Sequence, residues 1–367
     1  MSAQCIVVKF GTSTVTAGGP GPDEVRLSAL CHQIAHLRAQ GHQVVLVSSG
    51  AVATGRSALG AEAARDMPLK QMHAAVGQPR LHALYQRLFG ALDIQVAQVL
   101  LTRSDVENRR RYLNAREALT TMLAHGVLPI VNENDTVATE EIRLGDNDML
   151  SALVAGLVDA DRLVLLTDQA GLYDRDPRVD PQARLISRVG ATELTEQMRA
   201  AAGGSGRLGT GGMATKLAAA DLARRSGCVA HIAAGAEPNV LVRLLQDEAV
   251  GTRFELVEER VQARKRYILG GPACGELQVD DGAARALIRG GSLLPIGMVQ
   301  CSGRFDRGDA VRVVDADGNE LARGIAAYNS EDMPRLCRRR SDEIERILGY
   351  RYADEVIHRS DLVLTAS

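Results

Sequence analysis

The chain contains no tryptophan, and aromatic residues make up only 3% of its 367 residues. A surface that binds nucleic acid by stacking bases on aromatic rings would therefore have few rings to use. Lys and Arg number 43 against 45 Asp and Glu, so the formal net charge is -2. This near balance removes any general electrostatic attraction to nucleic acid or to an anionic membrane, although it leaves room for a local basic patch.

The sequence also lacks the patterns that mark metal sites, disulfide frameworks and membrane segments. None of the six cysteines falls in a CxxC spacing and the eight histidines form no HExxH pair, so we expect neither a zinc site nor a disulfide framework. No apolar run approaches the roughly 18–20 residues of a membrane-spanning helix. The first strand-like run begins at Ile6, which leaves no room for a signal peptide. We therefore predict a cytoplasmic protein that makes no membrane contact.

What the sequence does contain is an alternation of apolar runs and amphipathic stretches. Runs rich in Val, Leu and Ile predict β-strands over 5–10, 44–48, 94–101, 127–132 and 162–167. Apolar residues at helical spacing predict helices over 26–40, 64–91, 104–125 and 147–159. Near-continuous apolar strands separated by helices are typical of an open, mostly parallel sheet that helices cover on both faces, so the predicted fold class is α/β.

This pattern ends near residue 258. The segment 258–267 is charged and has no strand pattern, and beyond it short alternating strands are separated by tight turns, with a hairpin signal at Asp317-Gly318. From residue 261 onward the chain has 16 Lys and Arg against 16 Asp and Glu, so this part is not basic. We predict an α/β domain over 1–257, a linker over 258–274, a small β-barrel-like domain over 275–355 and a C-terminal tail over 356–367.

Two glycine-containing segments carry lysines suited to phosphate. The first predicted strand ends in Lys9, and Gly11 with hydroxyl residues follows it, which offers a charge and close backbone N–H groups. Six glycines within 203–212 lead into an Ala-rich helix with Lys216 in its first turn, where a phosphate partner would offset the unfavourable helix dipole. No Ser or Thr follows Lys216, so this is not a P-loop. The alternative for Lys9 is a solvated charge at the end of a strand. The alternative for 203–212 is a flexible hinge, with Lys216 as an ordinary surface lysine.

Two clusters of acidic and amide side chains, at 132–135 and 146–148, lie about a dozen residues apart. The second cluster begins an apolar helical run, where an Asp or Asn N-cap is routine. Capping uses only one or two of these side chains, and the remainder suit a substrate ammonium or the waters around a metal ion. Thr167 and Asp168 end another strand and are suited to a nucleotide, although alone they indicate only a strand-to-loop transition.

Five blocks of the sequence resemble the glutamate-phosphorylating members of the amino-acid kinase family: KFGTST, VSSGAVATG, VNENDTVATEEIRLGDNDMLSA, LLTDQAGLYDRDP and GTGGMATKLAAA. Their order and spacing match across residues 1 to about 255, and the remainder is similar to the PUA domain that many bacterial members carry. KFGTST also resembles the KFGGTS opening of aspartate kinases, but one glycine is missing and the C-terminal part does not resemble paired ACT domains. The resemblance implies an amino-acid kinase fold followed by a PUA domain.

The resemblance also implies an activity, namely ATP-dependent phosphorylation of the side-chain carboxylate of L-glutamate to L-glutamyl 5-phosphate, the first step of proline biosynthesis. Mg²⁺ would sit on the ATP phosphates and water, without protein ligands. Proline as a feedback inhibitor and a homo-oligomer, a dimer or a tetramer, are further implications. The alternatives are another amino-acid kinase, with aspartate or N-acetylglutamate as acceptor, and an RNA-binding PUA protein with a secondary kinase domain, which the balanced charge does not support.

Roles for single residues follow from the same resemblance. Lys9 and Lys216 would contact the ATP phosphates, and Asp148 would orient these two catalytic lysines. The residues that would hold glutamate are Ser49, Asp135 and Asn147. The residues that would contact ATP are Lys9, Gly11, Thr167, Asp168, Thr210, Gly211, Gly212, Met213, Ala214, Thr215 and Lys216.

Overall fold

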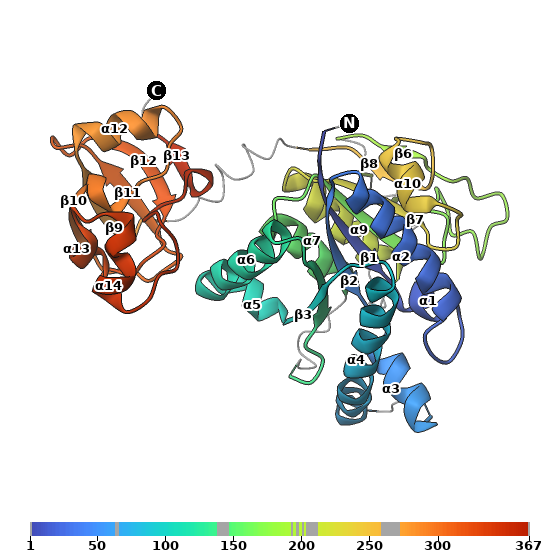
Figure 1. Ribbon diagram of the computed structural model, residues 1–367. Helices are drawn as coiled ribbons and strands as arrows, with labels where there is room; N and C mark the ends of the chain where they lie inside the picture. The colour runs from blue at the N-terminus through green and yellow to red at the C-terminus, as the bar shows by residue number, and fades with distance from the viewer. Residues whose placement is uncertain are drawn as a thin grey trace. The chain divides into compact units, whose positions relative to one another are not determined.

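The structure is a computed structural model that describes residues 2–62, 66–137, 147–191, 194–195, 198–199, 202, 212–257 and 272–365. The chain divides into two compact units, the first built mainly from residues up to 259 and the second mainly from the residues after it. Figure 1 shows both units, with labels on many of their helices and strands.

Eight strands among the described residues form the sheet of the first unit, in the order β3-β4-β2-β1-β5-β7-β8-β6. They are β1 Cys5–Phe10, β2 Gln43–Ser48, β3 Val96–Leu101, β4 Leu128–Glu133, β5 Arg162–Thr167, β6 Arg188–Val189, β7 Val229–Ala234 and β8 Thr252–Phe254. Neighbouring strands are parallel except β7 and β8, which are antiparallel. The predicted α/β class with a mostly parallel sheet is confirmed, and the five predicted strands correspond to β1 through β5.

Helices cover both faces of this sheet. The described helices up to residue 259 are α1 Thr12–Thr16, α2 Glu24–Ala39, α3 Ala51–Leu59, α4 Met67–Gly90, α5 Arg103–Glu107, α6 Arg109–Ala124, α7 Asn147–Leu157, α9 Met213–Arg225 and α10 Val240–Leu245. Residues 107–114, which include the start of α6, belong to the second unit. Apolar residues of α2, α4 and α10 share one core with Ile6, Val8 and Phe10 of β1. Helices α7 and α9 pack against each other, α7 also against β1 and α9 against β7. Because side chains alternate along a strand, Lys9 of β1 faces away from the core that contains α2.

One predicted helix of this unit is divided in two. The range 104–125 forms α5 and α6, and Asn108 separates them. The Asn108 side chain accepts a hydrogen bond from the backbone N–H of Arg111 at 3.1 Å, which is the contact of a residue that begins a new helix. The prediction of one continuous helix was wrong because Asn108 caps the second helix rather than continuing the first.

The second unit has a five-stranded sheet in the order β10-β9-β11-β12-β13. Its strands are β9 Gly275–Val279, β10 Met298–Gly303, β11 Ala310–Val314, β12 Glu320–Ile325 and β13 Leu362–Leu364. Its helical segments are α12 Asp281–Ile288, η2 Pro295–Gly297, α13 Met333–Leu336, η3 Ser341–Glu343, α14 Ile344–Leu348 and η4 Arg359–Asp361. Strands β11 and β12 form an antiparallel hairpin whose connection contains the predicted Asp317-Gly318 turn, with Gly318 at a φ of 84°.

Residues 356–365, predicted as part of a tail, contribute to this second unit. Val356 and Ile357 are fully buried in its core, and β13 pairs with β12 through Leu362, Val363 and Leu364. The prediction of a tail is therefore corrected through residue 365. Most of the predicted linker, residues 258–271, lies outside the described residues, and the other domain boundaries stay predictions.

Candidate active site

Two lysines and one aspartate form a buried cluster at the carboxyl ends of the central strands of the first unit. The ammonium nitrogen of Lys9 lies 2.5 Å from Oδ1 of Asp148, and that of Lys216 lies 3.1 Å from Oδ2 of the same carboxylate. The three side chains are between 0% and 5% exposed. We call these residues the lysine–aspartate cluster. The structure thus brings together the three residues predicted to be catalytic, and their catalytic role stays a prediction.

Each member of the cluster comes from a different element. Lys9 lies on β1 and points to the face of the sheet that α7 and α9 cover. Asp148 is the second residue of α7, and Lys216 is the fourth residue of α9. Both therefore lie in the first turn of a helix, so that two helix N-termini converge on the end of one buried strand. This convergence explains why the cluster forms from segments that are distant in sequence.

The charges of the cluster are unbalanced. Two ammonium groups share one carboxylate, so these three side chains carry a net charge of 2 − 1 = +1. Burial disfavours the ionised carboxyl, but the positive charges of Lys9 and Lys216 outweigh burial and hold the pKa of Asp148 below its usual range. Two buried ammonium groups beside one carboxylate are suited to an anion such as a phosphate group.

The beginning of α9 adds a hydroxyl and backbone groups to the cluster. The Thr215 hydroxyl lies 2.8 Å from Oδ2 of Asp148 and 2.8 Å from the carbonyl oxygen of Gly212. Gly212 precedes the helix and has no side chain to cap the first N–H groups. N–H groups at the start of a helix are suited to an anion. Met213 and Ala214 lie half-buried in the same turn. Two further predicted ATP contacts lie outside the described residues: Thr210 and Gly211.

Next to this cluster, Ser49 and Asn147 form part of a network of hydrogen bonds. The side-chain amide of Asn147 donates to the Ser49 hydroxyl at 3.1 Å and to Oδ1 of Asn132 at 2.9 Å. Oδ1 of Asn147 in turn accepts from the backbone N–H of Glu133 at 3.2 Å. Ser49 follows β2, and Asn132 and Glu133 end β4, the neighbouring strand. We call Ser49, Asn132 and Asn147 the amide network.

Asp135, predicted to bind glutamate, lies two residues beyond β4 and is half-buried. Burial raises the pKa of its carboxyl group to about 6. Among the residues that the structure describes, no basic side chain forms an ion pair with Asp135. A carboxylate in this position is suited to bind a cation from a ligand, and an ammonium group is one such cation.

The predicted nucleotide residues Thr167 and Asp168 lie at the carboxyl end of β5, the neighbour of β1. The buried Thr167 hydroxyl donates to Oδ1 of the exposed Asp168 at 2.9 Å. The backbone N–H of Gly11, expected to face a phosphate, instead donates to the carbonyl oxygen of Leu166 at 3.3 Å. A Cβ at Gly11 would lie 3.5 Å from the Lys9 ammonium nitrogen, so the glycine keeps space open beside that charge.

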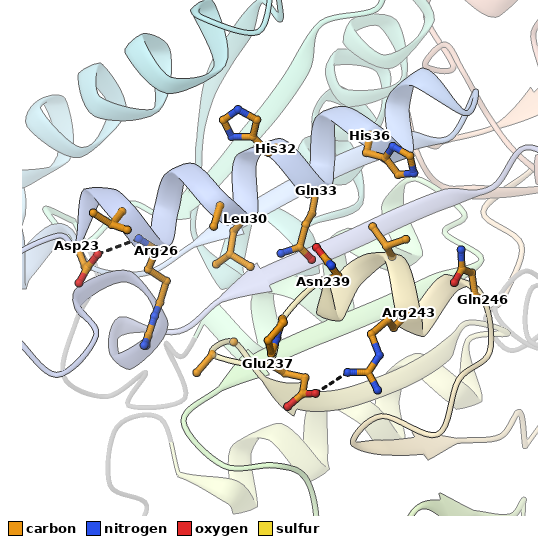
Figure 2. Close-up of a pocket in the computed structure, with 16 residues that line it drawn as sticks. Asp23, Arg26, Leu30, His32, Gln33, His36, Glu237, Asn239, Arg243 and Gln246 are labelled. Atoms are coloured by element: carbon orange, nitrogen blue, oxygen red, sulfur yellow. Dashed lines mark hydrogen bonds and ion pairs between the residues drawn. The ribbon is translucent and has the colours of Figure 1, made fainter.

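A separate pocket of about 940 Å³ lies on the opposite side of the sheet, between α2 and the segment that joins β7 to α10 (Figure 2). Arg26 and Gln33 of α2 line it, as do Glu237 and Arg243, which form an ion pair at 2.5 Å. No residue of the lysine–aspartate cluster or of the amide network lines this pocket, because these residues lie toward α7. The pocket is therefore distinct from the candidate active site.

These features define an α/β protein with a candidate ligand site at the carboxyl edge of a mostly parallel sheet. The chain belongs to the amino acid kinase family, which it matches over residues 4–234, and its residues 275–348 match the PUA domain. It is 51% identical over 365 residues to the glutamate 5-kinase of Vibrio campbellii (strain ATCC BAA-1116), covering 98% of this chain and 96% of that protein.

A second relative, the glutamate 5-kinase of Serratia marcescens, is 47% identical over 366 residues and is covered to 99%, as is this chain. Among solved structures, the UMP kinase from Bacillus anthracis superposes with a TM-score of 0.48 at 16% identity, covering 69% of this chain and 96% of that one. Among the described residues, no helix has the length and apolar character needed to cross a membrane.

Sequence reasoning did not find two features of the site. The first is the hydrogen bond from Thr215 to Asp148, since the sequence suggested only that Thr215 would contact ATP. The second is Gln78 of α4, whose Oε1 accepts from Nδ2 of Asn132 at 2.6 Å. Gln78 lies inside a predicted helix, between Gly77 and Pro79, and the sequence pattern of this stretch predicts only a helix.

Proposed function

We propose that this chain transfers the terminal phosphoryl group of ATP to the side-chain carboxylate of L-glutamate, which yields L-glutamyl 5-phosphate and ADP. Its glutamate 5-kinase relatives align over 96–99% of their own lengths, which supports this acceptor. The observation that carries the proposal is the position of the lysine–aspartate cluster directly beside the amide network, joined through the consecutive residues Asn147 and Asp148. An anion site for phosphate thus adjoins a polar site for an amino acid.

The chemistry needs no general base. A glutamate carboxyl group has an ordinary pKa of about 4.3, so its oxygen is already a nucleophile at neutral pH. This oxygen forms a bond to the γ-phosphorus while the bond from that phosphorus to the β–γ bridging oxygen breaks, and ADP leaves with the electron pair. The difficulty is to bring two anions together, so catalysis consists of positioning and charge stabilisation.

The lysine–aspartate cluster meets this requirement. Lys9 and Lys216 supply positive charge for the phosphates, and the N–H groups at the start of α9 supply further donors. Asp148 holds the two ammonium groups at a fixed separation, which their mutual repulsion would otherwise increase. Thr215 orients the carboxylate by its hydrogen bond to Oδ2.

The amide network and Asp135 would bind the amino acid. The Ser49 hydroxyl accepts from Asn147, so its own proton is free to be donated to a carboxylate of glutamate. Asp135 would pair with the substrate ammonium. N-acetylation removes that charge, so this arrangement favours L-glutamate over N-acetylglutamate as the acceptor.

Mg²⁺ would accompany ATP and neutralise part of the phosphate charge. Among the described residues, no group of three or more His, Cys, Asp or Glu side chains is placed to hold a metal ion. That Mg²⁺ has no protein ligands stays a prediction that rests on the family resemblance. Thr167 and Asp168 would lie at the nucleotide. Feedback inhibition by proline, a homo-oligomeric state and the cytoplasmic location remain predictions that rest on the family resemblance, whereas the place in proline biosynthesis follows from the likeness to glutamate 5-kinases.

The proposal is tested by trapping the product. With ATP, Mg²⁺ and hydroxylamine, the acyl phosphate is converted to a hydroxamate, which is measured for L-glutamate, L-aspartate and N-acetyl-L-glutamate in parallel. We expect L-glutamate to give the hydroxamate at least tenfold faster than either alternative, roughly the discrimination that one ion pair provides. Equal or faster turnover of N-acetyl-L-glutamate would contradict the assignment of the acceptor.

A further inference from the structure

Helix α4 reaches the candidate active site through a chain of side-chain amides. Gln78 accepts from Asn132, Asn132 accepts from Asn147, and Asn147 donates to Ser49, with donor–acceptor distances of 2.6, 2.9 and 3.1 Å. We infer that Gln78 is a positioning residue for the amino-acid site, which acts through Asn132 and Asn147 to orient the Ser49 hydroxyl. This inference deepens the proposed function and rests on it, because it assumes that Ser49 and Asn147 bind the acceptor.

The hydrogen bonds among Gln78, Asn132, Asn147 and Ser49 permit only one orientation of the Asn132 and Asn147 amides. Oδ1 of Asn132 accepts from Asn147 and also from the backbone N–H of Glu133 at 2.9 Å. If the Asn132 amide were reversed, its NH₂ group would face the NH₂ group of Asn147 and a backbone N–H, and none of these groups is an acceptor. The bond from Nδ2 of Asn132 to Oε1 of Gln78 therefore favours the orientation in which Asn132 can accept from Asn147.

The Asn147 amide has its donors and one acceptor position occupied within the protein. Its amide donates to both Asn132 and Ser49, and its oxygen already accepts from the Glu133 backbone. Both donor hydrogens are thus engaged within the protein. Among the described residues, the second lone pair of the Asn147 oxygen and the proton of Ser49 remain for a ligand. Asn147 therefore sets the direction of the Ser49 hydroxyl, and Gln78 sets Asn147 from the opposite end of the chain.

The backbone around Gln78 is held rigidly against the segment that contains Ser49. Helix α3 begins two residues after Ser49 and packs on α4 at backbone distance. A Cβ at Gly77 would lie 1.8 Å from the carbonyl oxygen of Ala51, and a Cβ at Gly55 would lie 1.8 Å from that of His73. No side chain larger than hydrogen fits at either contact. The position of Gln78 relative to Ser49 is therefore fixed by packing, which a positioning residue requires.

A second hydrogen-bonded chain from α4 ends at the same serine. The fully buried Tyr85 hydroxyl lies 2.7 Å from Oγ of Ser48, and Oγ of Ser48 donates to the carbonyl oxygen of Ser49 at 2.9 Å. Tyr85 is seven residues after Gln78, which places the two side chains on one face of the helix, two turns apart. One face of α4 thus holds Ser49 by its backbone through Tyr85 and by its side chain through Gln78.

The test is the substitution Gln78→Met, which keeps the length of the side chain and removes the acceptor. Gln86→Met is the matched control, because Gln86 is an exposed glutamine on the same helix. We expect Gln78→Met to raise the KM for L-glutamate about tenfold, the effect of one lost hydrogen bond to a polar side chain, with kcat and the KM for ATP changed less than about threefold. Gln86→Met should leave all three constants at the wild-type values.

A double-mutant cycle separates positioning from a general structural effect. In an Asn147→Ala background, Gln78→Met should add less than about twofold to the KM for glutamate, because the residue through which it acts is gone. Independent tenfold effects that multiply would overturn the inference, as would an unchanged KM in the single variant. If Gln78→Met does not fold, Gln78→Ala carries the same expectations without the bulk of the methionine side chain.

A crystal structure of the Gln78 variant gives a readout that does not depend on the acceptor. The Asn132 side chain should shift from its wild-type position and its contact with Asn147 should lengthen; an unchanged amide network would overturn the inference. If the wild-type protein phosphorylates another amino acid, the proposed function fails. The inference about Gln78 is then still tested by the effect of the same variants on the KM for that acceptor. The two failures are thereby distinguishable.

Discussion

The lysine–aspartate cluster and the amide network meet at two consecutive residues of α7, yet different forces hold them. Asp148 is fully buried between two ammonium groups, and the cluster has one positive charge in excess. Asn147, its neighbour, belongs to a neutral network in which each amide has a fixed donor and acceptor direction. Charge acts over distance and responds to any change of charge in the ligand, whereas a directional hydrogen bond responds to the shape and position of the ligand.

This difference assigns the two regions to different stages of the proposed reaction. Negative charge moves toward the β–γ bridging oxygen only as the phosphoryl group transfers, so the cluster should stabilise the transition state more than the bound substrates. The acceptor keeps its ammonium and its position throughout the step, so the amide network and Asp135 should act equally on the ground state and on the transition state. Variants of the first region should therefore change kcat, and variants of the second should change KM.

The largest effect is expected for Lys216→Ala. This substitution leaves Lys9 and Asp148 as a balanced pair, so the protein should fold, but one charge that stabilises the transition state is lost. We expect kcat to fall by about 10²–10³-fold, with the KM for glutamate nearly unchanged. Steady-state kinetics with each substrate varied in turn provide the measurement.

Lys70→Ala is the matched control for this variant. Lys70 is also the fourth residue of a helix, α4, but its side chain is exposed. It should retain wild-type kinetics. If Lys216→Ala instead raised the KM for glutamate and left kcat intact, Lys216 would belong with the substrate-binding residues, and the division between the two regions would be wrong.

The second effect concerns Asp135 and pH. Because burial raises the pKa of this carboxyl to about 6, protonation below that pH removes the charge that would pair with the substrate ammonium. We expect kcat/KM for glutamate to fall about tenfold per pH unit below pH 6, since kcat/KM reports the ionisation of the free enzyme. Measurements at pH 5 and above avoid protonation of the glutamate side chain, whose pKa is about 4.3.

Asp135→Asn removes the titrating group and provides the comparison. Its KM for glutamate at pH 8 should exceed the wild-type value by about 30-fold or more, the usual effect of breaking a close charge pair, and this acid limb should be absent. A variant that kept the wild-type pH profile would show that another group titrates, and Asp135 would then lose its assigned role.

The sequence predicts the charged region better than the neutral one, for a physical reason. A lysine at the end of an apolar strand and a lysine after a run of glycines conflict with local expectations, so Lys9 and Lys216 stand out without knowledge of the fold. The resemblance implied that one carboxylate, Asp148, orients both lysines. In the structure, the packing of α7 against α9 brings Lys216 and Asp148 together beside Lys9. The five strands were predictable because burial on both faces of a parallel sheet requires continuous apolar runs.

Gln78 could not be predicted in this way. Its partner Asn132 is 54 residues away. Gly77 and Pro79, which flank Gln78, are unusual inside a helix, but neither indicates which side chain Gln78 contacts. The break between α5 and α6 was missed for a related reason, since the effect of Asn108 depends on one side-chain hydrogen bond. Residues whose role is a single long-range contact leave no periodic or compositional signal.

The smallest effect is expected when the second unit is removed. All described residues of the lysine–aspartate cluster, the amide network and the nucleotide segments lie before residue 257, and the first unit has its own sheet and hydrophobic core. A chain that ends at residue 257 should therefore fold, with a cooperative thermal transition, and should keep kcat and the KM for glutamate within about twofold of the full-length values.

Differences should appear in the dependence on Mg²⁺ or in the oligomeric state, which are measured by titration and by light scattering. A folded truncation that is inactive at every Mg²⁺ concentration would show that the second unit supplies part of the catalytic machinery, and the comparison between the two regions of α7 would then describe only half of the site.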